Sequence, residues 1–168
     1  MVTKPEPLRP DHVLSGFDSG VPSLDDWLRQ RAINNQASGA SRTFVVCDEG
    51  AVVAYFALAA SAVAAGAAPG RFKRNMPDPI PVIVLARLAI ARSHQHQGLG
   101  RALFQDAALR VIHASQAIGV RGLLVHAISD EAKAFSFYLR LGLAESPLEP
   151  MSLMTTVDDL KQAVLGGP

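Results

Sequence analysis

The sequence contains only one cysteine, Cys47, so no disulfide can form within the chain and no zinc site can be built from several cysteines. Long apolar runs are also missing. The longest, residues 51–65, is shorter than the roughly 20 residues that a membrane-spanning helix needs. Residues 1–7 lack the apolar core of a signal peptide. These absences predict a cytoplasmic protein, in which Cys47 is a small core residue.

Length and composition predict one compact globular domain over residues 1–168. The chain is 49% apolar and 18% charged, a balance that supports a core and argues against disorder. The charges are unevenly placed, because residues 71–121 carry a net +6 and the remainder −5. The basic side chains of this segment are Arg71, Lys73, Arg74, Arg87, Arg92, Arg101, Arg110 and Arg121. We expect the segment to attract anions, although an ordinary solvated surface fits the composition equally well.

The first third of the chain predicts a helix followed by a β-hairpin. Apolar residues recur every three or four positions over residues 24–37, which is typical of an amphipathic helix. Ser23 is the expected N-cap of this helix, and Gly39 is its expected end. Two runs rich in β-forming residues, 43–47 and 52–56, then flank a short turn and predict the hairpin.

The rest of the chain alternates apolar strands with helices. Residues 60–79 are interpreted as a loop with a basic tip, and the almost continuously apolar residues 81–91 as a central strand covered on both faces. The later elements expected are a long helix with Leu103, Ala107, Val111, Ala114 and Ile118 on one face, a strand at 122–127, a helix at 130–141 ended by Gly142, a strand at 151–157 and a helix at 158–165. This order predicts an α/β fold without a linker between domains.

A glycine-containing loop, residues 95–100 (Gln-His-Gln-Gly-Leu-Gly), lies between the central strand and the long helix. Glycine lets the backbone pass close to a ligand, and the N–H groups at a helix start can bind phosphate. A tight strand-to-helix turn without a ligand explains the same residues equally well. The loop has no Walker Gly-Lys-Ser/Thr, and it lacks the first glycine and the acidic partner of a dinucleotide-binding fingerprint.

A second motif, residues 137–143 (Phe-Tyr-Leu-Arg-Leu-Gly-Leu), ends the later helix. On its own, Tyr138 would be interpreted as a core aromatic residue packed against Phe135. Together with the glycine loop earlier in the chain, the motif resembles the GNAT superfamily of N-acetyltransferases over roughly residues 41–157. The resemblance implies the GNAT fold, in which helices flank a mixed, twisted central sheet, and it implies acetyl-coenzyme A as the acetyl donor.

The resemblance also implies roles for individual residues. In GNAT enzymes, the strand before the loop pairs with pantetheine, the loop binds pyrophosphate, and the tyrosine protonates the departing thiolate. Tyr138 is therefore the expected catalytic acid. The expected cofactor-binding residues are Leu88, Ala89 and Ile90 on the strand and Gln95, His96, Gln97, Gly98, Leu99, Gly100 and Arg101 on the loop.

The likeness narrows to the GNAT toxins of type II toxin–antitoxin modules and covers nearly the whole chain. It rests on residues 17–20, 24–28, 35–36, 40–44, 80–81, 85–90 and 125–127 and on the spacing of Pro147 and Pro150. Such toxins acetylate the α-amino group of aminoacyl-tRNA, which inhibits translation, and a ribbon-helix-helix antitoxin neutralises them. The resemblance thus implies aminoacyl-tRNA and that antitoxin as partners, and a homodimer.

The chain departs from this pattern at several positions. Members commonly carry glycine and lysine where His96 and Gln97 stand, so this loop has less flexibility and one positive charge fewer. Leu143 replaces the usual phenylalanine. Many GNAT enzymes have an asparagine after the strand that here ends at residue 127, whereas this chain offers Ser129 and Asp130. These departures do not remove the residues needed for acetyl transfer, but they lower the expected affinity for pyrophosphate.

The chemistry needs few protein groups. A free α-amino group titrates near ~7.7–8.0, so part of it is already neutral at cellular pH, and no dedicated general base is evident. A strand N–H near Leu88 can donate to the tetrahedral oxygen, and Tyr138, with a reference pKa near ~10, can protonate sulfur. No metal is expected: His94 and His96 lack a third ligand and are interpreted as solvated loop residues. His126 is interpreted as a strand residue with a local hydrogen bond.

The basic segment predicts where a nucleic-acid substrate binds. The expected tRNA-binding residues are Arg71, Lys73, Arg74, Arg87 and Arg92. Two other functions stay open: acetylation of a free small amine or protein N-terminus, and a non-catalytic module that binds acyl-coenzyme A. The presence of both Tyr138 and the glycine loop argues against the non-catalytic module, and the net +6 of residues 71–121 favours tRNA over a small amine.

Overall fold

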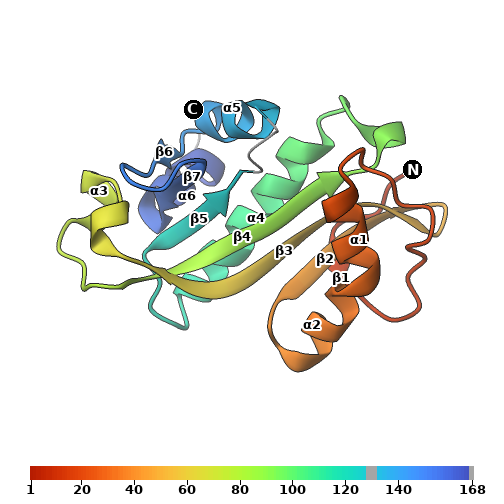
Figure 1. Cartoon of the computed structure of the whole chain (residues 1–168), viewed down its shortest axis with the longest axis horizontal. Coiled ribbons are helices and arrows are strands. Elements are labelled where there is room, and N and C mark those ends of the chain that lie inside the picture. The colour runs from red at the N-terminus through yellow and green to blue at the C-terminus, as the bar shows by residue number, and fades with distance from the viewer. Residues whose placement is uncertain (128–131, 167–168) are drawn as a thin grey trace. The chain divides into compact units, whose positions relative to one another are not determined.

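The computed structural model describes residues 1–127 and 132–166 and contains a seven-stranded sheet with the order β1-β2-β3-β4-β5-β7-β6 (Figure 1). The β4–β5 pair is parallel, whereas β1–β2, β2–β3, β5–β7 and β6–β7 are antiparallel. The predicted α/β class with a mixed sheet is therefore confirmed. No helix in the described part of the chain has the length and apolar character needed to cross a bilayer.

The chain divides into two compact units. The first unit is formed by Met1–Ala59 with Ala86–Ala107, and the second unit by Ala60–Leu85 with Ala108–Pro168. The first unit contains β1 (Glu6–Pro7), α1 (Pro22–Gln30), α2 (Ala32–Ser38), β2 (Arg42–Asp48), most of β3 (Ala51–Val63), the end of β4 (Ile80–Ile90), a 3-10 turn (Arg92–His94) and the start of α4 (Leu99–Ser115).

The hairpin predicted in the first unit is confirmed. Strands β2 and β3 pair in antiparallel register from Arg42 opposite Leu58 to Asp48 opposite Ala51. The turn places Glu49 at φ 50° and Gly50 at φ 84°, a left-handed conformation that suits glycine.

The helix predicted over residues 24–37 is instead two helices that meet at Arg31. Ser23 lies inside α1 rather than at its N-cap, which is Val21, because Pro22 occupies the first helical position and its fixed φ suits a helix start. Asp25 stabilises this entry by accepting hydrogen bonds from the Ser19 N–H at 3.1 Å and the Ser19 hydroxyl at 2.6 Å. Gly39 ends α2 at φ 84°, as predicted.

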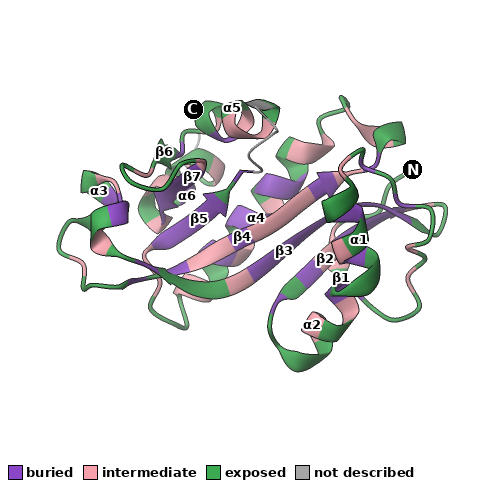
Figure 2. Ribbon diagram, viewed as in Figure 1, coloured by how far each residue is buried: buried purple, intermediate pink, exposed green. Residues whose placement is uncertain are grey.

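The second unit contains the end of β3, a 3-10 turn (Ala65–Ala67), α3 (Gly70–Lys73), the start of β4, the end of α4, β5 (Gly122–His126), α5 (Ala132–Arg140), β6 (Ala144–Glu145), β7 (Ser152–Thr156) and α6 (Val157–Val164). Figure 2 shows β5 and β7 almost entirely buried. Gly122 is required where these strands meet, because a Cβ there would collide with the backbone of Thr155 and Thr156.

The interpretation of residues 60–79 as a loop is wrong in two respects. β3 continues to Val63, and the segment that follows contributes to a core instead of staying outside it. This core cluster joins Val63, Ala67, Ala68, Phe72, Ile80, Val82, Leu124 and Met154. Small alanine side chains let the segment pack closely, and Phe72 anchors the one-turn helix α3, so only its basic side chains face solvent.

Two later predictions need smaller corrections. Ile118 is 65% exposed, because α4 ends at Ser115 before the predicted apolar face reaches it. The last strand stops at Thr156, whose hydroxyl accepts the Asp159 N–H at 3.0 Å and caps α6. Ser129 and Asp130, two positions at which the chain departs from the GNAT pattern, lie outside the described residues.

Candidate active site

The glycine loop of the first unit forms a strand-to-helix turn with free backbone donors. His96 at φ 62° and Gly98 at φ 82° bend it, and both are exposed. The first hydrogen bond of α4 runs from the Ala102 N–H to the Gly98 carbonyl at 3.2 Å. The N–H groups of residues 99–101 therefore have no acceptor within the helix, and a helix start of this kind can bind an anion.

The Gln95 side chain shapes this loop. Its Nε2 donates to the carbonyls of Ser19 and Ile90, each at 2.8 Å, which ties the loop to β4 and to the segment before α1. Both amide hydrogens of Gln95 are thus used inside the chain, so a contribution to an anion site would come from its backbone and its neighbours. No pattern in the sequence indicates that the Gln95 side chain holds the loop in this way.

The two loop histidines differ. His94 is half-buried, its Nε2 lies 2.7 Å from Asp48 Oδ2, and its Nδ1 lies 2.7 Å from the Ser93 hydroxyl. Hydrogen bonds from His94 and from the N-terminal amine lower the pKa of Asp48. The interpretation of His94 as a solvated residue is therefore wrong, whereas His96 is exposed as expected.

The strand residues expected to pair with pantetheine lie at the end of β4. Ala89 is 4% exposed, while Leu88 and Ile90 are half-buried. The parallel register between β4 and β5 runs from Val82 to Leu85, so residues 88–90 lie beyond this register.

Tyr138 lies in the last turn of α5, in the second unit, and its side chain is buried. Its ring meets Phe137 edge-on at 5.2 Å between centroids, and the residue is 6% exposed. Burial raises the pKa of Tyr138 above its ordinary value, so the phenol keeps its proton at neutral pH.

The motif around Tyr138 is a Schellman helix end. The Leu143 N–H donates to the Tyr138 carbonyl at 3.2 Å, and the Gly142 N–H donates to the Leu139 carbonyl at 3.0 Å. Gly142 at φ 96° takes the left-handed position, and Leu143 is 4% exposed. The spacing from Tyr138 to Gly142 and Leu143 is thus explained by the helix end, which fixes the backbone of the tyrosine.

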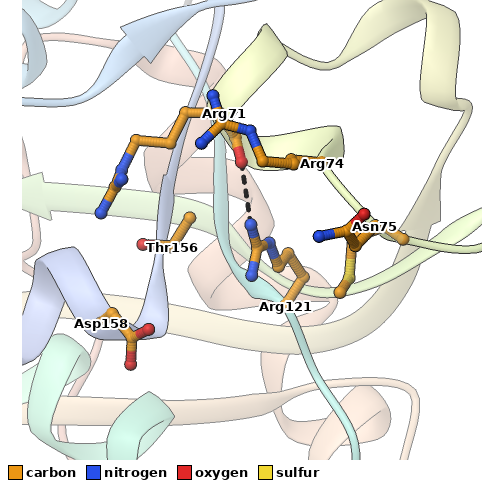
Figure 3. A pocket seen from close by; sticks show the side chains of 7 residues that line it. Arg71, Arg74, Asn75, Arg121, Thr156 and Asp158 are labelled. Carbon is orange, nitrogen blue, oxygen red and sulfur yellow. Dashed lines mark hydrogen bonds between the residues drawn. The ribbon is translucent and has the colours of Figure 1, made fainter.

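The basic tip of α3 is held by partners that the sequence did not reveal. Arg71 makes a bidentate ion pair with Asp159: Nε donates to Oδ2 at 2.9 Å and Nη2 donates to Oδ1 at 2.8 Å. Arg121 donates from Nε to the Phe72 carbonyl and from Nη2 to the Arg71 carbonyl, both at 2.8 Å. Figure 3 shows the bond between Arg121 and Arg71. These bonds satisfy the carbonyls at the end of α3, so they fix the shape of the tip.

A pocket of about 210 Å³ adjoins this tip. Its lining residues are Arg71, Arg74, Asn75, Met76, Arg121, Thr156 and Asp158. Lys73 and Arg74 are exposed beside the ion pair of Arg71. The three basic residues expected to bind tRNA here therefore do lie together, with Arg121 as a fourth that sequence reasoning had not placed among the binding residues.

Arg87 and Arg92 belong to the first unit and have different surroundings. The Arg87 guanidinium lies 4.5 Å from the centroid of the Trp27 ring. Arg92 is exposed and pairs with Asp18 at 3.3 Å. No pattern in the sequence indicates the contact between Trp27 and Arg87.

One group of potential metal ligands occurs among the described residues. Ligand atoms of Glu6, His12 and Cys47 lie within 4.8 Å of one another. Hydrogen bonds already use Glu6 and His12: His12 Nε2 lies 2.7 Å from Glu6, and His12 Nδ1 accepts the Arg9 N–H at 2.9 Å. Burial raises the pKa of the Cys47 thiol, which disfavours the thiolate that a metal requires. Cys47 is a buried residue, as predicted.

His126 also behaves as predicted. It ends β5, and its Nδ1 lies 2.7 Å from the Ser152 hydroxyl on the neighbouring strand β7.

The chain matches the family model of the acetyltransferase (GNAT) domain over residues 39–143. A tRNA-acetylating toxin of Mycobacterium tuberculosis is 48% identical over 151 residues, which cover 90% of each chain. The chain belongs to the GNAT acetyltransferase family. As a GNAT acetyltransferase, it is an acyltransferase that uses acetyl-coenzyme A.

Two solved GNAT toxin structures are similar along almost the whole chain. AtaT complexed with acetyl-methionyl-tRNAfMet has a TM-score of 0.87 and 29% identity, covering 96% of this chain and 98% of that chain. An AtaT mutant toxin with tyrosine changed to phenylalanine, bound to the C-terminus of the antitoxin AtaR and acetyl-CoA, has a TM-score of 0.79 and 29% identity, covering 96% of both chains. The described fold is thus that of the GNAT toxins.

Proposed function

We infer that this chain is the toxin of a type II toxin–antitoxin module, which transfers the acetyl group of acetyl-coenzyme A to the α-amino group of aminoacyl-tRNA and so inhibits translation. The observation that carries this inference is the 48% identity to a tRNA-acetylating toxin over 90% of both chains. The similarity of the fold to AtaT in complex with an acetylated aminoacyl-tRNA supports it. Since the similarity spans both units, we take residues 1–168 as one GNAT domain.

The acetyl donor is assigned to the first unit. Backbone N–H groups at the start of α4 bind the pyrophosphate of acetyl-coenzyme A. The loop residues assigned to this role are Gln95, His96, Gln97, Gly98, Leu99, Gly100 and Arg101. Leu88, Ala89 and Ile90 pair with pantetheine through their backbone. Support comes from the unsatisfied donors at the helix start and from the end of the β4–β5 register at Leu85, before these three residues.

Tyr138 is assigned as the general acid. The neutral α-amino nitrogen attacks the thioester carbonyl, an N–C bond forms, and the C–S bond breaks. The departing thiolate takes the phenol proton, while the amine releases its own proton to water, from which Tyr138 is reprotonated. The phenol is protonated at neutral pH before each turnover, as a general acid must be.

We assign the binding of tRNA to basic side chains, namely Arg71, Lys73, Arg74, Arg87 and Arg92. Arg71 and Arg92 keep a carboxylate partner each, so Lys73, Arg74 and Arg87 have more capacity for phosphate. We further propose that a ribbon-helix-helix antitoxin binds the chain, which co-purification with the product of the neighbouring gene would test. We also propose that the chain is a homodimer, which its mass in solution would test.

Cell-free translation provides a functional test. The purified chain should stop synthesis of a reporter when acetyl-coenzyme A is present and should leave it unaffected when acetyl-coenzyme A is omitted. Freshly charged tRNA, added after removal of the toxin, should restore synthesis. Inhibition that does not depend on acetyl-coenzyme A would overturn the proposed function.

A further inference from the structure

Arg87 differs from Arg71, Arg92 and Arg121 in having no polar partner among the described residues, and from the exposed Arg74 and Arg101 in being half-buried. Arg71, Arg92 and Arg121 each bind a carboxylate or backbone carbonyls. Within residues 1–127 and 132–166, the guanidinium of Arg87 has neither a hydrogen bond nor an ion pair, although the residue is half-buried, and it lies over the face of Trp27. Leaving charged donors partly buried and unpaired is unfavourable, which points to an anion supplied from outside the chain.

The indole beneath Arg87 is fixed by the core of the first unit. Trp27 stacks on Tyr55 with centroids 5.9 Å apart and ring planes 11° apart. Tyr55 is fully buried, donates its hydroxyl to the Leu24 carbonyl at 2.7 Å and meets Phe17 edge-on at 5.6 Å. Because these contacts restrain Trp27, the cation–π contact holds the Arg87 side chain in one place.

The arrangement leaves the donors of Arg87 available. A guanidinium that lies over an aromatic face keeps its N–H groups in its own plane, where they can bind two oxygens of a phosphate at once. Trp27 therefore acts as a positioning residue, and Arg87 supplies the charge.

We propose that Arg87, positioned by Trp27, binds a phosphodiester of the single-stranded 3′ end of aminoacyl-tRNA. The proposal rests on the proposed function, because it takes the acetyl group to lie beside residues 88–90. Arg87 directly precedes Leu88 on β4, and adjacent Cα atoms lie about 3.8 Å apart. The reacting α-amino group is only a few covalent bonds from the terminal ribose, so the phosphates of the last nucleotides must lie near this part of β4.

The single tryptophan of the chain makes this site directly observable. The protein is titrated with an RNA oligonucleotide that ends in CCA and carries no amino acid. The fluorescence of Trp27 should change, since a phosphate that binds Arg87 alters the charge over the indole. Binding is measured independently by the anisotropy of a dye on the 5′ end of the RNA. RNA that binds without changing Trp27 fluorescence would overturn the proposal.

Variants of Arg87 provide the quantitative test. Arg87→Gln should weaken RNA binding about tenfold, the loss expected for a charge-assisted contact, and should lower the slope of log K against log salt by about 0.7. Arg87→Lys should restore part of the affinity. Arg31→Gln, which removes an exposed charge from the same unit, should leave affinity and slope unchanged. Equal behaviour of Arg87→Gln and Arg31→Gln would reject the site.

The role of Trp27 is tested by the same anisotropy assay. Trp27→Phe keeps an aromatic face and should retain most of the affinity, whereas Trp27→Leu should lose about as much as Arg87→Gln, with circular dichroism confirming the fold of both. Acetyl transfer separates this proposal from the proposed function. RNA binding that depends on Arg87 without acetylation of aminoacyl-tRNA would reject the function alone, and acetylation unaffected by Arg87→Gln would reject the site alone.

Discussion

The two units use their polar groups in different ways. In the first unit, hydrogen-bond donors are left without acceptors among the described residues: the N–H groups at the start of α4 and the guanidinium of Arg87. In the second unit, Arg71 and Arg121 are committed to Asp159 and to carbonyls of α3, and Tyr138 is buried. Hydrogen-bond donors without an acceptor favour ligand binding, whereas donors that already bind an acceptor within the chain favour a rigid structure. This difference supports our proposal that the first unit binds acetyl-coenzyme A, while the role of Tyr138 in proton transfer stays a prediction.

Tyr138→Phe should separate these roles most strongly. It removes a hydroxyl and keeps the ring, so the rate of acetyl transfer should fall by about 10²- to 10⁴-fold, the range typical of general acid catalysis. The dissociation constant for acetyl-coenzyme A, measured by calorimetry, should stay within about twofold of the parent value because the donor loop is untouched. Turnover at the parent rate would reduce Tyr138 to a packing residue.

The dependence of stability on alkaline pH tests the burial of the two tyrosine side chains. Burial raises the pKa of both tyrosines, Tyr55 and Tyr138. Their contribution to stability is complete below the unfolded value of about 10 and is lost as pH rises above it, because the unfolded chain then binds fewer protons. The free energy of unfolding should fall by about 2.7 kcal/mol per pH unit from the pair. Urea titrations between neutral and alkaline pH should show half that slope for Tyr138→Phe, and an unchanged slope would contradict its burial.

Gly98→Val tests the first unit as the donor-binding unit. A side chain at φ 82° strains the loop and covers backbone donors, so affinity for acetyl-coenzyme A should fall about tenfold or more. Gly39→Val is the matched control: its φ is 84°, and a Cβ at either glycine meets open space among the described residues. If both variants lose affinity equally, strain explains the effect and the loop is not the binding site.

The smallest expected effect concerns the α3 tip. The double substitution Lys73→Ala and Arg74→Ala removes two exposed charges beside the fixed pair of Arg71 and Asp159. Binding of charged tRNA should weaken, and its slope of log K against log salt should fall by roughly 1.4–1.8, while affinity for acetyl-coenzyme A stays the same. Filter binding at several salt concentrations provides the slope. An unchanged slope would remove the α3 tip from the tRNA surface and point to a small-amine substrate.

Local patterns predicted the elements well where short-range physics decides. Turn residues marked the β2–β3 hairpin, and Gly142 marked the end of α5. The failures came from long-range packing. Nothing in the sequence near Phe72 shows that the segment around it joins a core with Met154, so local patterns predict a loop over residues 60–79.

The candidate site shows the same limit. The glycine loop and Tyr138 could be singled out from the sequence, and their roles remain predictions. The distant partners could not: Asp159 lies 88 residues from Arg71, and Trp27 lies far from Arg87 in the chain. Only folding decides which basic side chains are neutralised, so counting charges could not distinguish Arg71 from Arg87.

The mass of the reaction product tests the central claim most directly. Aminoacyl-tRNA is incubated with the protein and acetyl-coenzyme A whose acetyl group carries a heavy isotope, and the RNA is then digested to nucleosides. The account predicts that the label appears on the α-amino nitrogen of the aminoacyl group attached to the terminal adenosine. Label found only on free small amines or protein N-termini, with aminoacyl-adenosine unmodified, would contradict it.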